Sequence, residues 1–204
     1  MTRIFDILLS FFGLLILSPI LIVLIIIGLF DTASPLFLQE RIGVDQKPFN
    51  LLKFRSMHVN TQSIATHLAS AASITPFGHF LRKSKLDELP QLFNVLIGDM
   101  SLVGPRPEVK KYVDLYTQEQ RKVLSIRPGI TDWASIYYRN ENEILGKSTD
   151  PEKDYIEKVM PDKLNYNLRR LSNGSWPTRC LQALSRHSCR CCSIPSSGWR
   201  SLPE

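Results

Sequence analysis

Hydrophobic residues are concentrated in one uninterrupted block at the start of the chain. From Ile7 to Phe30, 24 consecutive residues carry no charge. A straight helix of this length would reach about 36 Å, which covers a hydrocarbon core of ~30 Å. A cleaved signal peptide fits less well, because the block exceeds the usual apolar core of about 7–15 residues and Pro35 disrupts the small-residue stretch where cleavage would occur. The pattern therefore predicts membrane attachment.

Pro19 interrupts this block near its centre. Proline has no N–H, so the carbonyl of Leu15 loses its helical partner and the helix kinks, leaving a carbonyl that the Ser18 hydroxyl can satisfy. A kinked helix that still crosses the membrane is one interpretation. The other is a helix that bends at Ser18-Pro19 and returns, with arms of about 16–18 Å that enter one leaflet only.

Charge placement favours the returning helix. Arg3 precedes the apolar block and Arg41 follows it, and a single crossing would place one basic end on the wrong side of the membrane. We therefore expect residues 1–35 to form a re-entrant, membrane-inserted helix-break-helix with its kink at Ser18-Pro19.

Shorter patterns follow in residues 36–171. Apolar runs bounded by turn residues predict strands at 36–43 and 49–55, and small polar residues predict a surface loop at 60–74. Leucines at helical spacing predict an amphipathic helix at 86–97, and similar patterns predict helices at 108–125 and 150–171, the last with Pro151 in its first turn. The expected fold is α-rich mixed α/β, a compact domain on the membrane surface.

The last part of the chain, residues 172–204, has no apolar periodicity and is rich in Ser, Arg, Cys and Pro, so we expect a disordered tail. All four cysteines lie there: Cys180, Cys189, Cys191 and Cys192. With His187 they raise the possibility of a metal knuckle, but their spacing matches no standard zinc pattern. The rest of the chain has no cysteine, which fits a reducing compartment.

The net charge of +6 is shared equally between the tail and the rest of the chain. The tail holds four arginines and one glutamate, so it carries +3, and the remaining residues carry the other +3. This mild excess suits an anionic membrane surface or a phosphate ligand, and it does not indicate nucleic-acid binding.

The acidic pair Asp87-Glu88 has two interpretations. Acids in the first turn of a helix that Ser84 caps would complement the helix dipole and need no further role. Alternatively, the pair is reactive, which is favoured by the cations around it in sequence. These are Lys53, Arg55, Arg82, Lys83, Lys85 and Arg106.

Arg106 stands between Pro105 and Pro107, which restrict the backbone and aim its planar guanidinium, a shape suited to bidentate phosphate binding. Two carboxylates beside several cations indicate a diphosphate held with a divalent metal. Mg²⁺ prefers oxygen ligands, so Asp87 and Glu88 are candidate magnesium ligands, and Asp87 is also a candidate nucleophile toward phosphorus.

Several longer motifs run along the chain in a characteristic order. They are Phe5-Asp6-Ile7, Leu17-Ser18-Pro19, Phe37-x-Gln39-x-Arg41-x-Gly43, Lys53-Phe54-Arg55-Ser56-Met57, Leu86-Asp87-Glu88-Leu89-Pro90-Gln91-Leu92 with its continuation to Ser101, Gly104-Pro105-Arg106-Pro107, and Arg127-Pro128-Gly129-Ile130-Thr131. In this order they resemble the bacterial sugar transferase family, the small monotopic polyprenyl-phosphate phosphoglycosyl transferases. The resemblance extends from about Arg3 to about Leu171.

The resemblance implies a reaction, in which a sugar 1-phosphate passes from a UDP-sugar to undecaprenyl phosphate and UMP is released. It implies that Asp87 attacks the β-phosphorus in a ping-pong scheme, that Glu88 positions Mg²⁺ or the acceptor phosphate, and that Lys53, Arg82 and Arg106 neutralise phosphate charge. It also implies the cytoplasmic face of a bacterial inner membrane, with membrane lipid and downstream glycosyltransferases as partners. The sugar and the glycan pathway stay open.

Two features depart from the family pattern. Asp132 stands where the family often has glycine before Trp-Ala, which suggests altered substrate contacts, and the tail replaces the apolar C-terminal structure of other members. The alternative function is a non-catalytic, membrane-anchored cationic binding protein or scaffold, in which the acidic pair only begins a helix.

Overall fold

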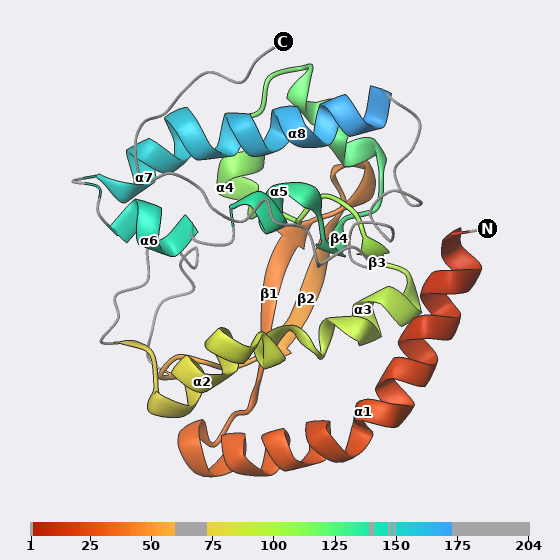
Figure 1. Ribbon diagram of the computed structural model, residues 1–204, viewed down its shortest axis with the longest axis vertical. Helices are drawn as coiled ribbons and strands as arrows, with labels where there is room; N and C mark the ends of the chain where they lie inside the picture. Colours follow the sequence, from red (N-terminus) through yellow and green to blue (C-terminus); the bar gives the residue numbers. More distant parts are fainter. Residues whose placement is uncertain (1, 60–72, 139–140, 147, 149, 173–204) are drawn as a thin grey trace, which may run out of the picture.

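The computed structural model describes residues 2–59, 73–138, 141–146, 148 and 150–172. A two-stranded hairpin runs through the centre, with α1, α2 and α3 at one end and α4 to α8 at the other (Figure 1). The expected mixed α/β fold is confirmed. Most of the predicted loop at 60–74, and the predicted disordered tail with its four cysteines and His187, lie outside the described residues.

The apolar block forms α1, Thr2–Thr32, a single helix of 31 residues with Pro19 inside it. The helix bends steeply near its middle (Figure 1), as expected where a proline removes a backbone hydrogen bond. The Ser18 hydroxyl donates to the Leu15 carbonyl at 2.7 Å, which confirms the predicted compensation. By length and composition, α1 is apolar enough to cross a membrane.

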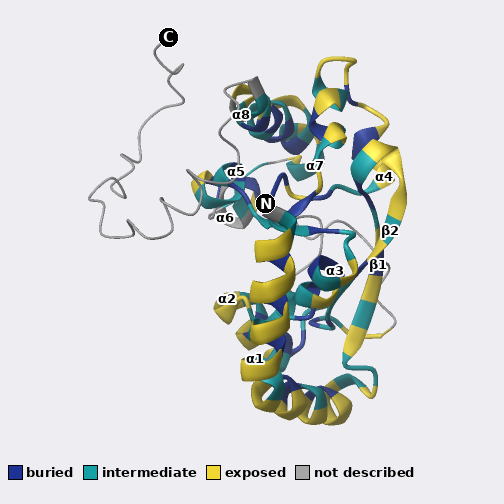
Figure 2. Cartoon of the chain, turned by 90° about the vertical axis from the view of Figure 1, so that its right-hand side faces the viewer, coloured by how far each residue is buried: buried dark blue, intermediate teal, exposed yellow. Residues whose placement is uncertain are grey.

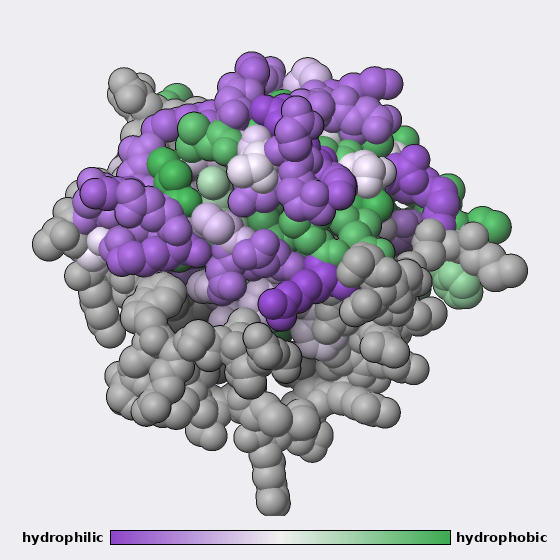
Figure 3. Space-filling view, turned by 90° about the horizontal axis from the view of Figure 1, so that it is seen from above, coloured by the Kyte–Doolittle hydropathy of each residue, from purple (hydrophilic) through white to green (hydrophobic). Residues whose placement is uncertain are grey.

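Large apolar side chains are exposed along both arms of α1, and Phe30 reaches 87% exposure (Figure 2). The opposite end of the molecule, seen from above in Figure 3, is mostly hydrophilic over the described residues. The protein therefore has an apolar end built from α1 and a polar end built around α8, as expected for a protein that inserts one end into lipid.

Both ends of α1 are hydrogen-bonded to the rest of the protein. The Arg3 guanidinium donates to the carbonyls of Val95 (2.5 Å) and Leu96 (2.9 Å), capping the C-terminal end of α3, Gln91–Ile97. Asp6 accepts from the Ser101 hydroxyl at 2.8 Å.

At the other end of α1, the Thr75 hydroxyl donates to Asp31 at 2.7 Å. Between the two ends, Leu21 and Leu24 pack against Phe54 and Leu81. The helix thus touches the same body at its start, its middle and its end.

The predicted strands are present as β1, Leu36–Ile42, and β2, Pro48–Phe54, joined by a 3₁₀ turn at Val44–Gln46. They pair antiparallel, from Leu36 opposite Phe54 to Ile42 opposite Pro48. Lys53 lies near the open end of this hairpin, opposite Phe37.

A second pair of strands was not predicted. β3, Ser101–Val103, runs parallel to β4, Gly129–Thr131. Three residues are too few to show an alternating pattern. The two strands approach closely at glycines: a Cβ on Gly129 would lie only 2.0 Å from the nitrogen of Gly104.

The prediction of one helix at 86–97 is wrong in its first half. α2, Pro76–Ser84, ends where Lys85 adopts a left-handed conformation with φ 60°, and a 3₁₀ turn, η4, follows at Leu86–Glu88. α3 begins only after Pro90. Ser84 does not cap the acidic turn, because its hydroxyl donates back to the carbonyls of Phe80 and Leu81.

The predicted helix at 108–125 is wrong as one continuous helix. Only α4, Lys110–Val113, and the 3₁₀ helix η5, Gln120–Ser125, are helical. Between them, Thr117 and Gln120 exchange side-chain-to-backbone hydrogen bonds that replace the helical ones.

The predicted helix at 150–171 is confirmed as α7, Pro151–Asp154, a π-helical turn, η6, at Tyr155–Val159, and α8, Met160–Ser172. Pro151 occupies its first turn, and Asp150 caps it by accepting from the Lys153 nitrogen. Two short helices, α5 (Trp133–Tyr137) and α6 (Glu141–Gly146), were not predicted.

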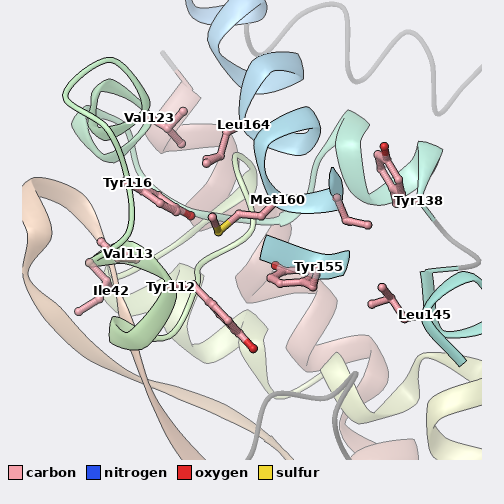
Figure 4. Close-up of a cluster of buried hydrophobic side chains, with 11 residues drawn as sticks. Ile42, Tyr112, Val113, Tyr116, Val123, Tyr138, Leu145, Tyr155, Met160 and Leu164 are labelled. Carbon is pink, nitrogen blue, oxygen red and sulfur yellow. The ribbon is translucent and has the colours of Figure 1, made fainter. Parts of the chain in front are cut away.

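The main hydrophobic core lies at the polar end, where α8 and the π-helical turn cover α4 and η5 (Figure 4). Tyr112 and Tyr155 are almost fully buried, with ring centroids 5.0 Å apart. Burial of side chains of this size contributes roughly 1.5–3 kcal/mol each. This core fixes α8, and therefore one wall of the cleft described below.

Candidate active site

The five residues that the sequence singled out for chemistry line one cleft with a volume of about 190 Å³. Lys53 comes from β2, Arg82 from α2, Asp87 and Glu88 from η4, and Arg106 from the segment after β3. We call this the cationic cleft. Residues more than 50 positions apart in the sequence therefore meet, as the charge pattern suggested.

The acidic pair is presented by a strained turn. Lys85 has φ 60° and links the end of α2 directly to η4, so the chain reverses just before Asp87. A non-glycine residue in this region is uncommon, and such conformations cluster at functional sites. The acids thus lie on a short 3₁₀ turn before α3, and both line the cleft.

Asp87 has an unsatisfied oxygen. Its Oδ1 atom is buried and accepts no hydrogen bond from any described residue. Burial raises the pKa of this carboxyl, the charge of Glu88 adds to that effect, and Lys85, Lys53 and Arg82 oppose it. A buried carboxylate oxygen with a free lone pair is suited to attack an electrophile or to bind a cation.

Glu88 is held by Arg106. The two guanidinium nitrogens lie 2.5 and 3.4 Å from the two carboxylate oxygens, which gives a bidentate ion pair. Burial opposes ionisation of Glu88, but the charge and hydrogen bonds of Arg106 outweigh it and lower the pKa of Glu88. The Arg106 fork, expected to face a phosphate, is here directed at Glu88.

Lys53 and Arg82 are held by neutral side chains. The Lys53 ammonium lies 3.0 Å from Gln39 Oε1, and Arg82 Nε donates to the Ser56 hydroxyl at 2.9 Å. Burial, followed by the charges of Arg41 and Arg106, lowers the pKa of Lys53 to about 8, although Asp87 opposes the shift. Neighbouring cations that lower the pKa of a lysine in this way create a positive potential, which favours binding of an anion.

Several residues of the cleft were missed as site residues from sequence. Arg41 lies there, donating to the Pro107 carbonyl at 3.1 Å and to Gln39 at 2.9 Å. Because Arg41 belongs to the Gln-x-Arg-x-Gly motif, the sequence could have identified it as a site residue. Another part of the lining carried no signal, because it comes from the short helices α5 and α6, the residue just after α5, and α8. Its polar residues are Ser135, Tyr138, Glu141 and Lys163.

Asp132 lies behind the cleft. It is buried and accepts hydrogen bonds from the backbone nitrogens of Ser135 (2.6 Å) and Arg106 (3.3 Å) and from the amide of Asn167 (3.2 Å). Where a glycine was expected from the resemblance, this carboxylate therefore caps α5 and joins it to α8 and to the Arg106 segment.

The donor set fits one type of metal site. Among the described residues no group of three or more His, Cys, Asp or Glu side chains is placed to hold a metal ion. The free oxygen of Asp87 and the carboxylate of Glu88 do suit Mg²⁺, which keeps several waters and takes its remaining ligands from substrate phosphates.

Comparison with known proteins agrees with this geometry. The sequence profile of a family described as "Bacterial sugar transferase" matches residues 1–167. This chain belongs to the bacterial sugar transferase family. The match includes α1, the hairpin, the acidic pair, Arg106 and most of α8.

Individual relatives cover different shares of their own length. The chain is 42% identical over 139 residues to the uncharacterized sugar transferase EpsL of Bacillus subtilis, spanning 68% of this chain and 69% of that protein. It is 39% identical over 149 residues to the UDP-glucose:undecaprenyl-phosphate glucose-1-phosphate transferase of Escherichia coli, spanning 70% of this chain but only 32% of that protein.

A third relative is the UDP-N-acetylgalactosamine-undecaprenyl-phosphate N-acetylgalactosaminephosphotransferase of Aeromonas hydrophila, 37% identical over 139 residues, spanning 65% of this chain and 33% of that protein. The chain therefore spans about two thirds of the Bacillus protein and about one third of the other two.

Proposed function

We propose that this chain transfers a sugar 1-phosphate from a UDP-sugar to undecaprenyl phosphate and releases UMP. The observation that carries the proposal is the unpaired, buried oxygen of Asp87 in a cleft lined by cations. The names of the Escherichia and Aeromonas relatives support the same class of reaction.

The first step is attack of the Asp87 carboxylate on the β-phosphorus of the donor. A bond forms between the carboxylate oxygen and phosphorus, the bond from that phosphorus to the bridging oxygen breaks, and UMP leaves with the electron pair. An oxygen of undecaprenyl phosphate then attacks the same phosphorus, and Asp87 leaves as a carboxylate. This ping-pong scheme forms a phosphosugar-aspartyl intermediate.

The cations neutralise charge as it moves between phosphate oxygens. Lys53 and Arg82 each have a neutral hydrogen-bond partner, so their positive charges remain available to phosphate. Arg106 keeps Glu88 ionised beside Asp87. Mg²⁺, when bound through Asp87 and Glu88, supplies further neutralisation of the diphosphate and of the departing UMP.

The proposal includes a re-entrant α1. Arg3 and Asp6 at its start and Asp31 at its end are hydrogen-bonded to one body, which supports a helix whose two ends lie on the same side of the bilayer. We place the cleft at the cytoplasmic face of a bacterial inner membrane, where UDP-sugars and the lipid phosphate meet. Downstream glycosyltransferases would use the lipid-linked product.

A reconstituted assay tests the reaction. The purified protein in detergent is incubated with Mg²⁺, undecaprenyl phosphate and a panel of UDP-sugars, and UMP is measured. We expect UMP release with at least one sugar, and labelled phosphosugar on the protein when the lipid acceptor is omitted.

The non-catalytic alternative, a cationic binding protein or scaffold, predicts a different result. There only positive charge matters, so Asp87→Asn would leave function intact. Absence of UMP with every sugar, or equal UMP release by the Asp87→Asn protein, would overturn the proposed reaction.

A further inference from the structure

The cationic cleft has two chemically different sides. One side presents the cations and the acidic pair. The other, which we call the second wall, is formed by Ser135 of α5, Tyr138 just after it, Glu141 of α6 and Lys163 of α8. The reaction proposed above uses only the first side, so the second wall has no role yet.

The second wall has no net charge. Glu141 and Lys163 form an ion pair, with the ammonium 2.9 Å from Oε2, and their side chains are only 21% and 12% exposed. The carboxylate retains acceptor capacity and the ammonium retains donors, since each uses only part of its hydrogen-bonding capacity in the pair. A neutral pair of this kind offers both donors and acceptors without attracting phosphate.

Ser135 adds an unused hydroxyl. Its Oγ is buried and has no hydrogen-bond partner among the described residues. Its backbone nitrogen is fixed by Asp132 at 2.6 Å, so the first turn of α5 holds the residue at the edge of the cleft. Buried hydroxyls are normally hydrogen-bonded, so the Ser135 hydroxyl is available to a ligand group that enters the cleft.

We propose that the second wall binds the sugar of the UDP-sugar and selects it through its hydroxyl or acetamido groups, an inference that rests on the proposed function. Sugar substituents point in several directions, which matches polar groups carried by three separate helices. The planar edge of uracil presents its donors and acceptors side by side and matches this arrangement less well.

The neighbouring cavity cannot take this role. Its lining includes Pro105, Pro107, Asp132 and Asn167, and its volume of about 30 Å³ is far smaller than the volume of about 190 Å³ of the cationic cleft. A hexose therefore has to lie in the larger cleft, with its phosphate towards Asp87 and its ring towards the second wall.

Two variants test the inference, Ser135→Ala and Glu141→Gln. kcat/KM is measured for each member of the UDP-sugar panel, together with inhibition by UMP. We expect Ser135→Ala to lower kcat/KM about tenfold for the sugar that the unmodified protein prefers, and much less for poorer sugars, so that the preference narrows. Inhibition by UMP, which has no sugar at that position, should change less than about twofold.

Controls separate this inference from the proposed function and from misfolding. Glu157→Gln alters an exposed glutamate of the adjoining π-helical turn and should change neither quantity. The melting temperature of Ser135→Ala should equal that of the parent protein, because the substitution leaves no partner unpaired; if Glu141→Gln fails to fold, Ser135→Ala decides alone.

The outcomes are distinct. If the unmodified protein releases no UMP from any sugar, the proposed function fails. If it is active but Ser135→Ala leaves the sugar preference unchanged, or weakens all sugars and UMP equally, the sugar-binding wall is wrong.

Discussion

The Glu88 carboxylate accepts hydrogen bonds from both terminal nitrogens of Arg106, 18 residues further along the chain. The adjacent Asp87 has no such partner for its buried Oδ1. Two consecutive acids are therefore placed in different environments: one is held ionised by an arginine, and the other is left free with a raised pKa. Such separation is how neighbouring carboxylates take different roles.

Replacing Asp87 by Asn should abolish UMP release, with a loss of at least about 1,000-fold, because the nucleophile is gone. No labelled phosphosugar should attach to the protein. The pKa of Asp87 is raised, so its ionised form destabilises the fold at neutral pH, and the Asn protein should melt at a higher temperature. Retained covalent labelling would contradict the assignment.

Replacing Arg106 by Ala should lower UMP release by about 100-fold, as expected when one charged donor is removed from an active site. Arg106→Lys should recover only part of the loss, since an ammonium cannot make the bidentate contact with Glu88. Lys122→Ala, which removes an exposed i,i+3 pair with Glu119, serves as the control and should retain full activity.

Activity should fall as pH rises through about 8 in measurements of kcat/KM. The pKa of Lys53 is lowered to about 8 in the free protein, chiefly by burial, so the ammonium that neutralises phosphate is lost above that pH. Lys53→Arg keeps its charge and should shift this alkaline limb to higher pH. If the alkaline fall in kcat/KM occurs at the same pH in Lys53→Arg, deprotonation of Lys53 is not its cause.

The same residue has an opposite effect on stability. Because the pKa of Lys53 is lower in the folded protein than in the unfolded chain, the unfolded chain binds more protons between about pH 8 and 10.5. The contribution of Lys53 to the free energy of unfolding should therefore rise across this range. Comparing urea unfolding of the parent protein and Lys53→Met at pH 7.5 and 10 in one detergent isolates the contribution.

Arg3→Ala should lower the free energy of unfolding by about 1.5–3 kcal/mol, because it removes charged hydrogen bonds to the carbonyls of Val95 and Leu96. The measurement is thermal or denaturant unfolding in detergent. Lys110→Ala removes only an exposed pair with Asp114 and should cost less than about 1 kcal/mol.

The topology of α1 can be read from thiol labelling. In a background without the tail cysteines, Thr2→Cys should resist an impermeant thiol reagent in intact cells and react after lysis. Replacing Pro19 by Leu restores the missing backbone donor, so a straighter helix should export the N-terminus and expose the thiol. If the Thr2→Cys protein that keeps Pro19 were labelled in intact cells, the re-entrant form would be excluded.

Sequence patterns predicted the structure correctly where a feature depends only on residues close together in the chain. The bend at Pro19 and its Ser18 partner, the β1–β2 hairpin, and Pro151 at a helix start all follow from rules about neighbouring residues. Lys53, Arg82 and the acidic pair were predicted to cluster because the motifs place several cations around two adjacent acids. All four residues line one cleft.

Features that depend on distant contacts were not predictable. The pairing of Arg106 with Glu88 requires knowing that η4 faces the segment after β3, so the sequence suggested a free guanidinium. The apolar period that predicted one helix at 86–97 is divided in the structure into the 3₁₀ turn Leu86–Glu88 and α3, which begins after Pro90. The second wall stayed hidden because α5 and α6 are too short to produce a helical pattern.

The anchorage of Arg3 also constrains how the protein is made. Its acceptor carbonyls on Val95 and Leu96 lie 92 and 93 positions later, so they do not yet exist when the ribosome releases the first helix. Contacts across so long a separation form late in folding. With the proposed membrane topology, α1 would therefore enter the lipid before these contacts form, and the rest of the fold would assemble on a helix that is already anchored.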